Sequence, residues 1–311
     1  MSGTSLDGLD IAICKFNIFN NNVSYEIVGA ETIDYNEQWQ KILQNAFMFS
    51  GYDLYKTDLL YGKFIGEEVL KLVNKYKITP LLIASHGHTI FHQPSEQLTL
   101  QIGSGAAISS VTGIPVVSDF RISDVLLGGQ GAPLVPMGEK ILFKGINSFL
   151  NIGGFANISF HNNDSKVIAW DVCPANIILN YLAQREQLEY DIDGKIASTG
   201  EIITDLLYEL NNLKYYLSLP PKSLAREWLE IEMLPVIKKY YHYPTKDLLR
   251  TLVEHIAIQV FVNFKKSIKN KIFITGGGAL NSFLIKRLKY YMGDAIYIPD
   301  RLIIKYKEAV I

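Results

Sequence analysis

The sequence has little cysteine, no excess of charge of either sign and no long apolar run. Two cysteines among 311 residues, Cys14 and Cys173, cannot build a disulfide framework, and neither lies in a CxxC pair. The 30 basic and 31 acidic residues form no basic stripe of the kind that nucleic acids or anionic membranes attract. No run approaches the roughly 18 apolar residues of a membrane span, and the opening MSGTSLDGLD is unlike a signal peptide. We therefore expect a cytoplasmic protein that partners neither nucleic acid nor membrane.

What the sequence does have is enough apolar material for a large core. Hydrophobic residues make up 48% of the chain and charged residues 20%. A chain of this length folds as two domains more readily than as one. Segments with period-two alternation are interspersed with segments of helical periodicity, so we expect an α/β fold. We predict two lobes, an N-terminal lobe over residues 1–140 and a C-terminal lobe over residues 141–311, each with a mixed sheet and flanking helices.

The chain begins with a glycine-rich turn, Gly3-Thr4-Ser5-Leu6-Asp7-Gly8-Leu9-Asp10. Two alternating segments, 11–18 and 23–33, follow it and predict a hairpin. Phosphate loops of the Walker A and dinucleotide types open a helix, and no helix follows here. A turn between strands can still hold phosphate through backbone N–H groups, while Asp7 and Asp10 can hold Mg²⁺ through water. Alone, the pattern is also typical of an ordinary turn.

Polar residues follow the strands predicted in the first half. The segment Ser85–His92 has three histidines without cysteine or carboxylate neighbours at metal-ligand spacing, so hydrogen bonding to a polar ligand is the favoured interpretation. Arg121 comes just after another predicted strand and offers a planar fork that suits a substrate carboxylate. A surface ion pair with Asp119 or Asp124 is the alternative. The glycines from 128 to 131 suggest a loop near a ligand or a hinge.

The second half repeats the order of strand, glycine turn and strand. Predicted strands at 149–152 and 156–160 flank Gly153-Gly154, and a third strand ends at Asp171. A duplicated hairpin with a glycine turn in each copy argues for two related lobes facing a shared cleft. A carboxylate at the carboxyl end of a strand lies where open α/β sheets bind ligands, so Asp171 is a candidate catalytic base. The alternative is a cap on the next helix.

A third glycine turn, Gly276-Gly277-Gly278, follows the apolar strand predicted at 271–275. Unlike the first two turns, it opens a helix. Backbone at such a turn is where the sugar or phosphate of a nucleotide packs.

Taken together, these blocks resemble the superfamily of sugar kinases, actin and Hsp70, and within it the anhydro-N-acetylmuramic acid kinases. The matching blocks are MSGTSLDGLD, ASHGHTIFHQP, TLQIGSG, TGIPVVSDFRISDVLLGGQGAPLVP, LNIGGFANIS, WDVCPAN, YDIDGKIASTG, PPKSLARE and ITGGGALN. The resemblance implies a two-lobed actin-like ATPase fold, of the duplicated ribonuclease H-like type, with a central cleft. It implies a kinase of peptidoglycan recycling that uses ATP, Mg²⁺ and water to open 1,6-anhydro-N-acetylmuramic acid, yielding N-acetylmuramic acid 6-phosphate. A homodimer is implied by the resemblance alone.

The resemblance also implies roles for residues, position by position. Asp171 matches the family's catalytic Asp, which activates water for attack at the anomeric carbon while the departing O6 takes the γ-phosphoryl group. The implied substrate-binding residues are His86, His88, Gln101, Arg121 and Glu308, with Arg121 on the lactyl carboxylate. The implied ATP-binding residues are Gly3, Thr4, Ser5, Leu6, Asp7, Gly8, Leu9, Asp10, Gly153, Gly154, Gly276, Gly277 and Gly278. The implied Mg²⁺ ligands are Asp7 and Asp10.

The chain departs from the family pattern in two places. Family members read Asp-Thr-Gly-Pro-Gly-Asn where this chain has Asp171-Val172-Cys173-Pro174-Ala175-Asn176. The family also has a strand before Met-Ser-Gly-Thr and a helical continuation beyond Lys-Glu-Ala. Two other hypotheses therefore stay open. One is a truncated inactive relic or a non-catalytic nucleotide-binding protein of the same superfold; the other is a sugar kinase of the superfamily that phosphorylates a free hydroxyl.

Overall fold

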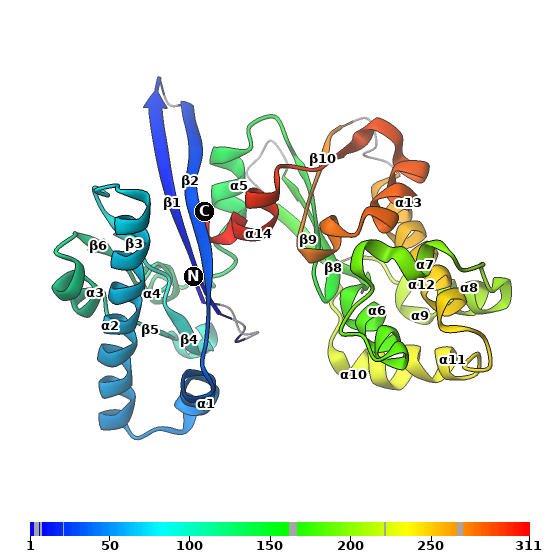
Figure 1. The fold of residues 1–311 in the computed structure, drawn as a ribbon, viewed down its shortest axis with the longest axis horizontal. Coiled ribbons are helices and arrows are strands. Elements are labelled where there is room, and N and C mark those ends of the chain that lie inside the picture. The colour runs from blue at the N-terminus through cyan, green and yellow to red at the C-terminus, as the bar shows by residue number, and fades with distance from the viewer. Residues whose placement is uncertain (3–5, 7, 21, 162–166, 221, 266–269) are drawn as a thin grey trace. The chain divides into compact units, whose positions relative to one another are not determined.

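The computed structural model describes residues 1–2, 6, 8–20, 22–161, 167–220, 222–265 and 270–311. Within them the chain divides into two compact units, Met1–Leu142 with Tyr306–Ile311, and Phe143–Lys305. Each unit combines strands and helices (Figure 1), which confirms the α/β class. The chain passes from the first unit to the second between Leu142 and Phe143, close to the lobe boundary that the sequence placed at residue 140. The C-terminal segment Tyr306–Ile311 differs from the prediction, because it belongs to the first unit and not to the second.

The first unit contains three two-stranded sheets in its described part, β1 with β2, β3 with β6, and β4 with β5. Its strands are β1 (Gly8–Phe19), β2 (Asn22–Asp34), β3 (Ile83–Ala84), β4 (His88–Gln93), β5 (Leu98–Ile102) and β6 (Val116–Val117). Its helices are α1 (Glu37–Asn45), α2 (Gly51–Tyr76), α3 (Gly105–Thr112), α4 (Ile122–Leu126), α5 (Val135–Leu142) and the end of α14 (Arg301–Val310). The histidine segment, which the sequence left without a strand, therefore forms β4.

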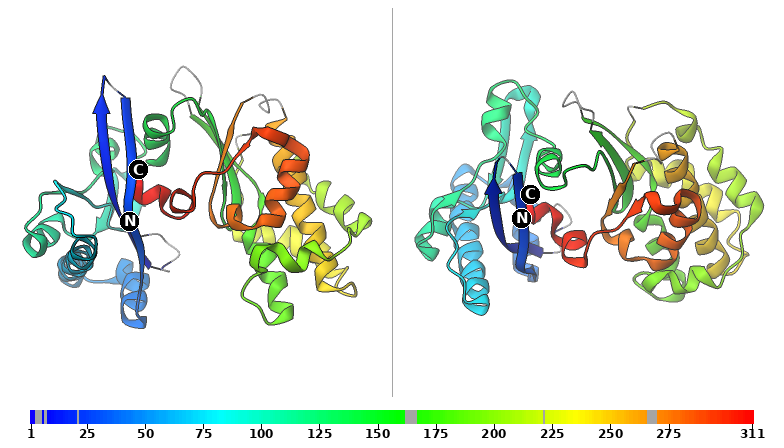
Figure 2. Two further views of the ribbon diagram at one scale, coloured as in Figure 1. Left: turned by 45° about the horizontal axis from the view of Figure 1, so that its top comes forward. Right: turned by 90° about the horizontal axis from the view of Figure 1, so that it is seen from above.

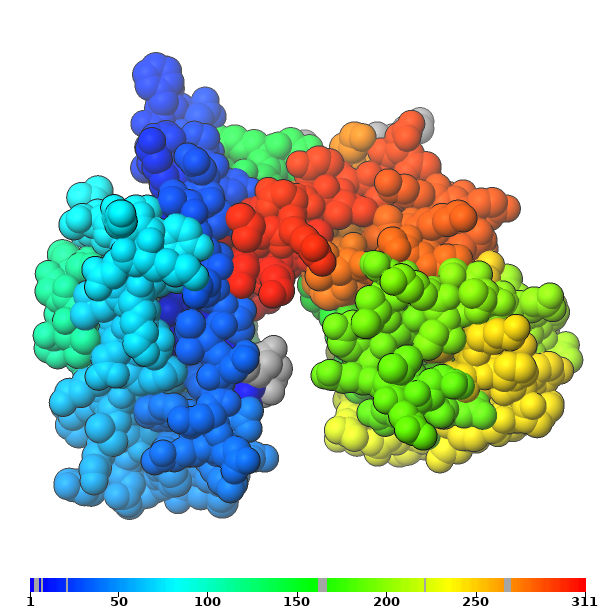
Figure 3. Space-filling model, in the orientation of Figure 1, coloured from blue at the N-terminus to red at the C-terminus, as the bar shows by residue number. Residues whose placement is uncertain are grey.

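The predicted N-terminal hairpin is present as an antiparallel pair, β1 with β2. A further antiparallel bridge joins Ser2 to Leu9, and the N–H of Asp10 donates to the carbonyl of Met1 at 2.9 Å. The far end of the hairpin, dark blue in Figure 3, projects beyond the cyan helix α2, and Phe19 there is 75% exposed. The chain thus runs back and forth three times at its N-terminus, the same antiparallel order that recurs in the second unit.

Helix α2 forms the main packing surface of the first unit. Its N-cap Ser50 accepts from the N–H of Asp53, and its C-cap Lys77 is left-handed with φ 54°. A Cβ at Gly62 would come within 2.7 Å of the Ser104 carbonyl and one at Gly66 within 2.9 Å of the Val111 side chain. These two glycines therefore let α3 approach α2 closely.

The second unit is built on one mixed sheet with the strand order β11-β10-β7-β8-β9. The strands are β7 (Ser148–Ile152), β8 (Phe155–His161), β9 (Val167–Pro174), β10 (Ile272–Thr275) and β11 (Ile296–Tyr297). Strand β10 is parallel to β7 and β11, whereas β7, β8 and β9 are antiparallel neighbours. The helices are α6 (Asn176–Ala183), α7 (Lys195–Ser198), α8 (Thr204–Asn211), α9 (Lys214–Leu217), α10 (Arg226–Trp228), α11 (Leu234–Lys238), α12 (Thr245–Phe264), α13 (Ser282–Met292) and the start of α14.

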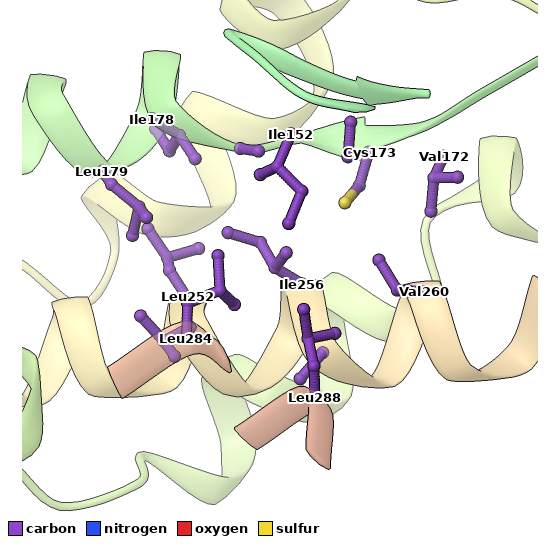
Figure 4. Close-up of a cluster of buried hydrophobic side chains, with 14 of the residues drawn as sticks. Ile152, Val172, Cys173, Ile178, Leu179, Leu252, Ile256, Val260, Leu284 and Leu288 are labelled. Atoms are coloured by element: carbon purple, nitrogen blue, oxygen red, sulfur yellow. The ribbon is translucent and has the colours of Figure 1, made fainter. Parts of the chain in front are cut away.

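Alternation along the strands separates the two faces of this sheet. Leu150 and Ile274 join the main core, while Phe149 and Phe273 face the other way and pack on each other with centroids 5.6 Å apart. Helices α12 and α13 lie on the core side, as Figures 1 and 2 agree. In Figure 4, Ile152 and Cys173 from the strands point toward side chains of α12. Helix α12 is buried on most of its surface, as expected of a central helix.

The strand that was predicted to end at Asp171 continues to Pro174, so the prediction of its end was wrong. Apolar burial does not stop at Trp170, because Val172 and Cys173 are both fully buried in the same core. The ladder is interrupted instead: Ala156 pairs with Cys173 and Asn157 with Asp171, which leaves Val172 as the extra residue of a β-bulge. Asp171 therefore lies inside an edge strand beside a bulge.

None of the helices in the described ranges combines the length and the apolar character needed to cross a lipid bilayer.

We expect the most costly polar substitution in the second unit to be at Glu254 of α12. Its buried carboxylate accepts from Arg250 at 2.6 Å, from Arg287 at 2.8 Å and from the Tyr291 hydroxyl. Glu254→Gln leaves two half-buried cations, Arg250 and Arg287, without their counter-charge and should destabilise the protein by about 3–5 kcal/mol in urea unfolding. The exposed pair of Arg226 with Glu230 supplies the control, because Glu230→Gln should cost about 1 kcal/mol or less.

The Glu254 carboxylate also predicts how the free energy of unfolding changes with pH. Burial alone would raise the pKa of Glu254, but the hydrogen bonds from Arg287, Arg250 and Tyr291 outweigh it and lower that pKa from 4.5 to about 2. Because the pKa of Glu254 is lower in the folded state than in the unfolded state, its ionisation stabilises the folded protein fully when the pH is above the unfolded pKa. This stabilisation is lost as the pH falls toward 2. The difference in unfolding free energy between parent and Glu254→Gln should therefore shrink between pH 4.5 and pH 2. An unchanged difference across that range would contradict the assignment.

Candidate active site

In the first unit, Arg121 is held by two internal acceptors. Its Nε donates to Nε2 of His86 at 3.0 Å, and a terminal nitrogen donates to the Gly131 carbonyl at 2.7 Å. Because His86 accepts at Nε2, its proton must lie on Nδ1, which is 3.0 Å from the Gly87 carbonyl. The glycine-rich segment after Arg121 is itself fixed, since the N–H of Gly131 donates to Asp124 at 2.6 Å. The guanidinium fork is therefore oriented before any ligand binds.

The charges around this fork favour a cation beside a neutral imidazole. Burial lowers the pKa of His86, and the neighbouring Arg121 lowers it further against the bond to Gly87. Burial also lowers the pKa of Arg121, while the charge of Glu308 opposes that change. Glu308 and Arg121 thus lie within electrostatic reach in the first unit. Of the five predicted substrate residues, His86 and Arg121 are therefore in direct contact, and the charge of Glu308 acts on Arg121.

His88 and Gln101 lie next to this group on paired strands, but their side chains are turned inward. His88 pairs with Ile102, and its Nδ1 is 2.9 Å from the Ser2 hydroxyl. A buried chain continues from Ser2 through Tyr35 at 2.8 Å to Tyr61 at 2.6 Å. Gln101 donates to Thr99 at 2.8 Å and is 9% exposed. These contacts indicate supporting positions, while direct contact of His88 or Gln101 with a substrate stays a prediction.

The predicted phosphate loop is only partly described. Gly3, Thr4, Ser5 and Asp7 lie outside the described residues, whereas Leu6, Gly8, Leu9 and Asp10 lie within them. Leu6 has φ 56°, the left-handed region that turns require. The carboxylate of Asp10 accepts from the Thr32 hydroxyl at 2.6 Å.

A metal site on Asp7 and Asp10 stays a prediction. Across residues 1–2, 6, 8–20 and the other described ranges, no group of three or more His, Cys, Asp or Glu side chains is placed to hold a metal ion. Because Asp7 lies outside those ranges, the predicted pair is not tested.

In the second unit, two of the predicted glycine turns and the start of α6 meet at one edge of the sheet. Gly276 and Gly278 pass so close to Ile152 that an added Cβ would lie 2.7 Å and 2.2 Å from it. The Asn176 amide at the start of α6 donates to the Ile152 carbonyl at 3.1 Å. The Gly154 carbonyl accepts from the N–H of Ala175 at 2.8 Å. The turns at Gly153-Gly154 and Gly276–Gly278 are therefore parts of one site.

This site has polar groups that lack a partner. Within the described residues, the hydroxyl of Thr275 is the buried side-chain polar atom without a hydrogen bond, and it immediately precedes Gly276. Gly153 is half-buried and Gly154 is exposed, and neither donates its N–H to an acceptor in the described part of the chain. A buried hydroxyl is normally hydrogen-bonded in proteins, so that of Thr275 calls for an explanation. A polar ligand such as a nucleotide phosphate or ribose fits these donors.

Asp171 lies on the edge strand of the same sheet and is held on three sides. Its N–H donates to the Lys222 carbonyl at 3.2 Å, and its carbonyl accepts from the Tyr215 hydroxyl at 2.6 Å. Its carboxylate oxygen Oδ2 accepts from the N–H of Leu224 at 2.8 Å. The other oxygen, Oδ1, has no partner among the described residues. This carboxylate does not cap α6, whose N-cap Ala175 has no side-chain bond, so the alternative role as a helix cap is wrong.

Comparison with known proteins identifies the family. The family model described as anhydro-N-acetylmuramic acid kinase matches residues 1–300. The chain belongs to the anhydro-N-acetylmuramic acid kinase family. It is 34% identical over 307 residues to the protein of that name from Aliivibrio fischeri, covering 94% of this chain and 83% of the relative. It is 34% identical over 320 residues to the one from Caldanaerobacter subterraneus, covering 93% and 81%.

Among solved structures, the chain is similar to component A of (R)-2-hydroxyglutaryl-CoA dehydratase from Acidaminococcus fermentans. The identity is 12%, the coverage is 96% of this chain and 95% of that chain, and the TM-score is 0.42. The ROK hexokinase from Thermus thermophilus matches with 8% identity, 91% and 88% coverage and a TM-score of 0.35. Similarities of this size carry no conclusion about fold or function.

Family membership confirms the resemblance inferred from the sequence, but several residues of the candidate site were missed. Tyr215 had no assigned role. Leu224 lies in the block PPKSLARE, which matched the family without suggesting a function, because it acts through its backbone N–H. Thr275 ends a strand whose apolar pattern gives no sign of an unpaired hydroxyl. A helical or strand pattern reports which face is buried and does not report which donor is left over.

We expect substitutions at Gly277 and Gly278 to separate ligand binding from folding. An added Cβ at Gly277 would meet only the Asn176 amide at 3.5 Å, an ordinary contact, whereas at Gly278 it would lie 2.2 Å from the Ile152 side chain. Gly277→Ala should therefore keep the Tm of the parent but weaken ATP binding in calorimetry by about ten-fold. Gly278→Ala should lower the Tm by overpacking, at a cost of about 1–3 kcal/mol.

Equal ATP affinity in Gly277→Ala and the parent, with both folded, would place the nucleotide elsewhere.

Proposed function

We propose that the protein is an ATP-dependent kinase that hydrolytically opens 1,6-anhydro-N-acetylmuramic acid and phosphorylates it to N-acetylmuramic acid 6-phosphate, in peptidoglycan recycling. The observation that carries the proposal is the family match over residues 1–300, which includes both Asp171 and Arg121. The proposed catalyst is Asp171, and the proposed substrate-orienting residue is Arg121. The comparisons give no support to the inactive relic or the non-catalytic nucleotide-binding protein.

The proposed reaction requires one general base from the protein. Oδ1 of Asp171 takes a proton from water, and the water oxygen forms a bond to the anomeric carbon of the sugar. The bond from that carbon to O6 breaks, and O6 forms a bond to the γ-phosphorus of ATP while the bond from that phosphorus to the bridging oxygen breaks and ADP leaves. A base of this kind contributes about 10²–10⁴-fold to the rate. The hydrogen bond from Leu224 to Oδ2 supports the role, because it leaves Oδ1 for the water.

The sugar is recognised by its charge in the first unit. The anhydro-sugar has a lactyl carboxylate, and a guanidinium fork binds a carboxylate with two parallel hydrogen bonds. His86 and Gly131 occupy Nε and one terminal nitrogen of Arg121, which directs the remaining donors. Because His86 is a neutral acceptor, the positive charge that faces the carboxylate belongs to Arg121 alone.

The nucleotide is assigned to the glycine turns, Gly153-Gly154 and Gly276–Gly278 in the second unit and Gly3–Asp10 in the first. The unpaired Thr275 hydroxyl and the free N–H groups of Gly153 and Gly154 support the assignment in the second unit. Mg²⁺ held by Asp7 and Asp10 would neutralise phosphate charge. We further propose a cytoplasmic location, in keeping with two free cysteines, and a homodimer.

The test of this function uses the anhydro-sugar, ATP and water enriched in ¹⁸O. Because water opens the ring, solvent oxygen should appear at the anomeric carbon of the phosphorylated product. Each product molecule should then be two mass units heavier than one formed in ordinary water. Phosphorylation without ¹⁸O would indicate a kinase that acts on a free hydroxyl. Binding of ATP without any phosphorylated product would instead favour a non-catalytic nucleotide-binding protein.

We expect Arg121→Lys to damage sugar binding selectively. Lysine keeps the charge but loses the planar fork, and hydrogen bonds to charged groups contribute about 1.5–3 kcal/mol each. The KM for the sugar should rise by roughly ten-fold or more, while the KM for ATP stays within two-fold. Arg185→Lys is a matched control, since Arg185 also bonds a backbone carbonyl, that of Tyr241, at 3.0 Å in the second unit.

His86 supplies a second control for the same fork. His86→Leu removes the acceptor of Arg121 and should raise the sugar KM in the same direction, whereas His86→Gln keeps an acceptor oxygen and should recover part of the loss. Equal rises in both KM values for Arg121→Lys would reject the assignment of Arg121 to the sugar.

A further inference from the structure

We infer that Tyr215 and the backbone of residues 222–224 form a bracket that positions Asp171, with Tyr215 as a positioning residue for catalysis. The inference rests on the proposed role of Asp171 as the base. The bracket is the set of three hydrogen bonds to Asp171 described above, from the Tyr215 hydroxyl, from Leu224 and to Lys222.

The need for a bracket follows from the place of Asp171 in the sheet. Strand β9 is the edge of the five-stranded order, so its outer backbone groups have no neighbouring strand. The bulge at Val172 further interrupts pairing with β8 beside Asp171. The N–H of Asp171 donates to the Lys222 carbonyl at 3.2 Å, and the carbonyl of Asp171 accepts from the Tyr215 hydroxyl at 2.6 Å. These two bonds satisfy the outer backbone groups of Asp171, as a neighbouring strand would.

The third bond acts on the carboxylate itself. The N–H of Leu224 lies 2.8 Å from Oδ2, which fixes the rotation of the carboxyl group. With the backbone on both sides and one oxygen held, Oδ1 has a defined position. A base misplaced by about 1 Å can lose about 10²-fold in rate, so a set of bonds that removes this freedom bears directly on turnover.

The bracket is itself stiffened from within. The Lys222 ammonium donates to the carbonyls of Tyr215 at 3.1 Å and Ser218 at 3.0 Å, and it lies 4.5 Å from the centre of the Tyr215 ring. The same ring packs against Trp228, with centroids 5.4 Å apart. Burial, with the charge of Asp171, raises the pKa of the Tyr215 hydroxyl, which therefore stays a donor. These contacts fix the position of the Tyr215 side chain, so its hydroxyl can in turn fix the position of Asp171.

The neighbouring tyrosine provides a matched control. Tyr216 lies on the same helix α9 and is likewise half-buried, but its hydroxyl is 3.1 Å from Nε2 of the core residue His255 and has no hydrogen bond to Asp171 in the described part of the chain. Tyr215→Phe and Tyr216→Phe each remove one hydroxyl and nothing else. A role that is merely structural should make the two variants alike in stability and in kinetics.

The experiment measures kcat, both KM values and Tm for Tyr215→Phe, Tyr216→Phe and Asp171→Asn with ATP and the anhydro-sugar. Asp171→Asn should lose about 10²–10⁴-fold in kcat. Tyr215→Phe should lose about ten-fold in kcat with both KM values within two- to three-fold, and Tyr216→Phe should stay within two-fold in kcat. Amide hydrogen exchange at Asp171 and Leu224, which needs no turnover, should be faster in Tyr215→Phe than in the parent.

The outcomes separate the inference from the function it rests on. If Asp171→Asn is inactive while Tyr215→Phe turns over within two-fold of the parent, the bracket is rejected and the base assignment stands. Equal losses of kcat and Tm in the two tyrosine variants would reduce the bracket to a structural contact and reject the positioning role. If Asp171→Asn itself turns over normally, the base assignment fails and the inference fails with it.

Discussion

The second unit depends on one packing constraint, the burial of Ile152 between the sheet and helix α12. Its side chain is fully buried in the core, and it is in contact with parts of the candidate nucleotide site in the second unit. Gly276 and Gly278 approach it within distances that no Cβ would allow, and Asn176 donates to its carbonyl. Because cores are close-packed and shift little, the packing that fixes Ile152 also fixes the glycine turn that contacts it. Stability and site geometry are therefore coupled at this residue.

The two units hold their candidate residues by different means. In the first unit, side chains are oriented by other side chains, as Arg121 is by His86, and the arrangement requires a neutral imidazole at a half-buried position. In the second unit, the backbone does most of the work: glycine turns, a bulge and the N–H of Leu224 set the positions. A low-dielectric interior strengthens such bonds and also penalises any that are missing.

The sequence was informative where local chemistry decides the structure and silent where distant residues do. Alternation predicted the N-terminal hairpin and the strands β7 and β8. The end of β9 was misplaced, because the strand continues beyond Asp171 through a bulge at Val172 that no periodicity reveals. The place of the C-terminal segment was misjudged for a related reason. Lys307 and Glu139, 168 residues apart, form a buried ion pair at 2.8 Å that a local pattern cannot show.

The departures of this chain from the family pattern after Asp171 are accommodated by the fold. Val172 and Cys173 lie in the core, where their side chains add apolar contacts that glycine would lack, and burial raises the pKa of the Cys173 thiol, so it stays protonated and inert. Ala175 has φ −126°, a value that does not require glycine. The chain retains Gly153 and Gly154, whose N–H groups are the donors that we propose for the phosphate. The substitutions therefore remove a hydroxyl from this region without removing the backbone that a phosphate would contact, and they give no physical reason to read the chain as a relic.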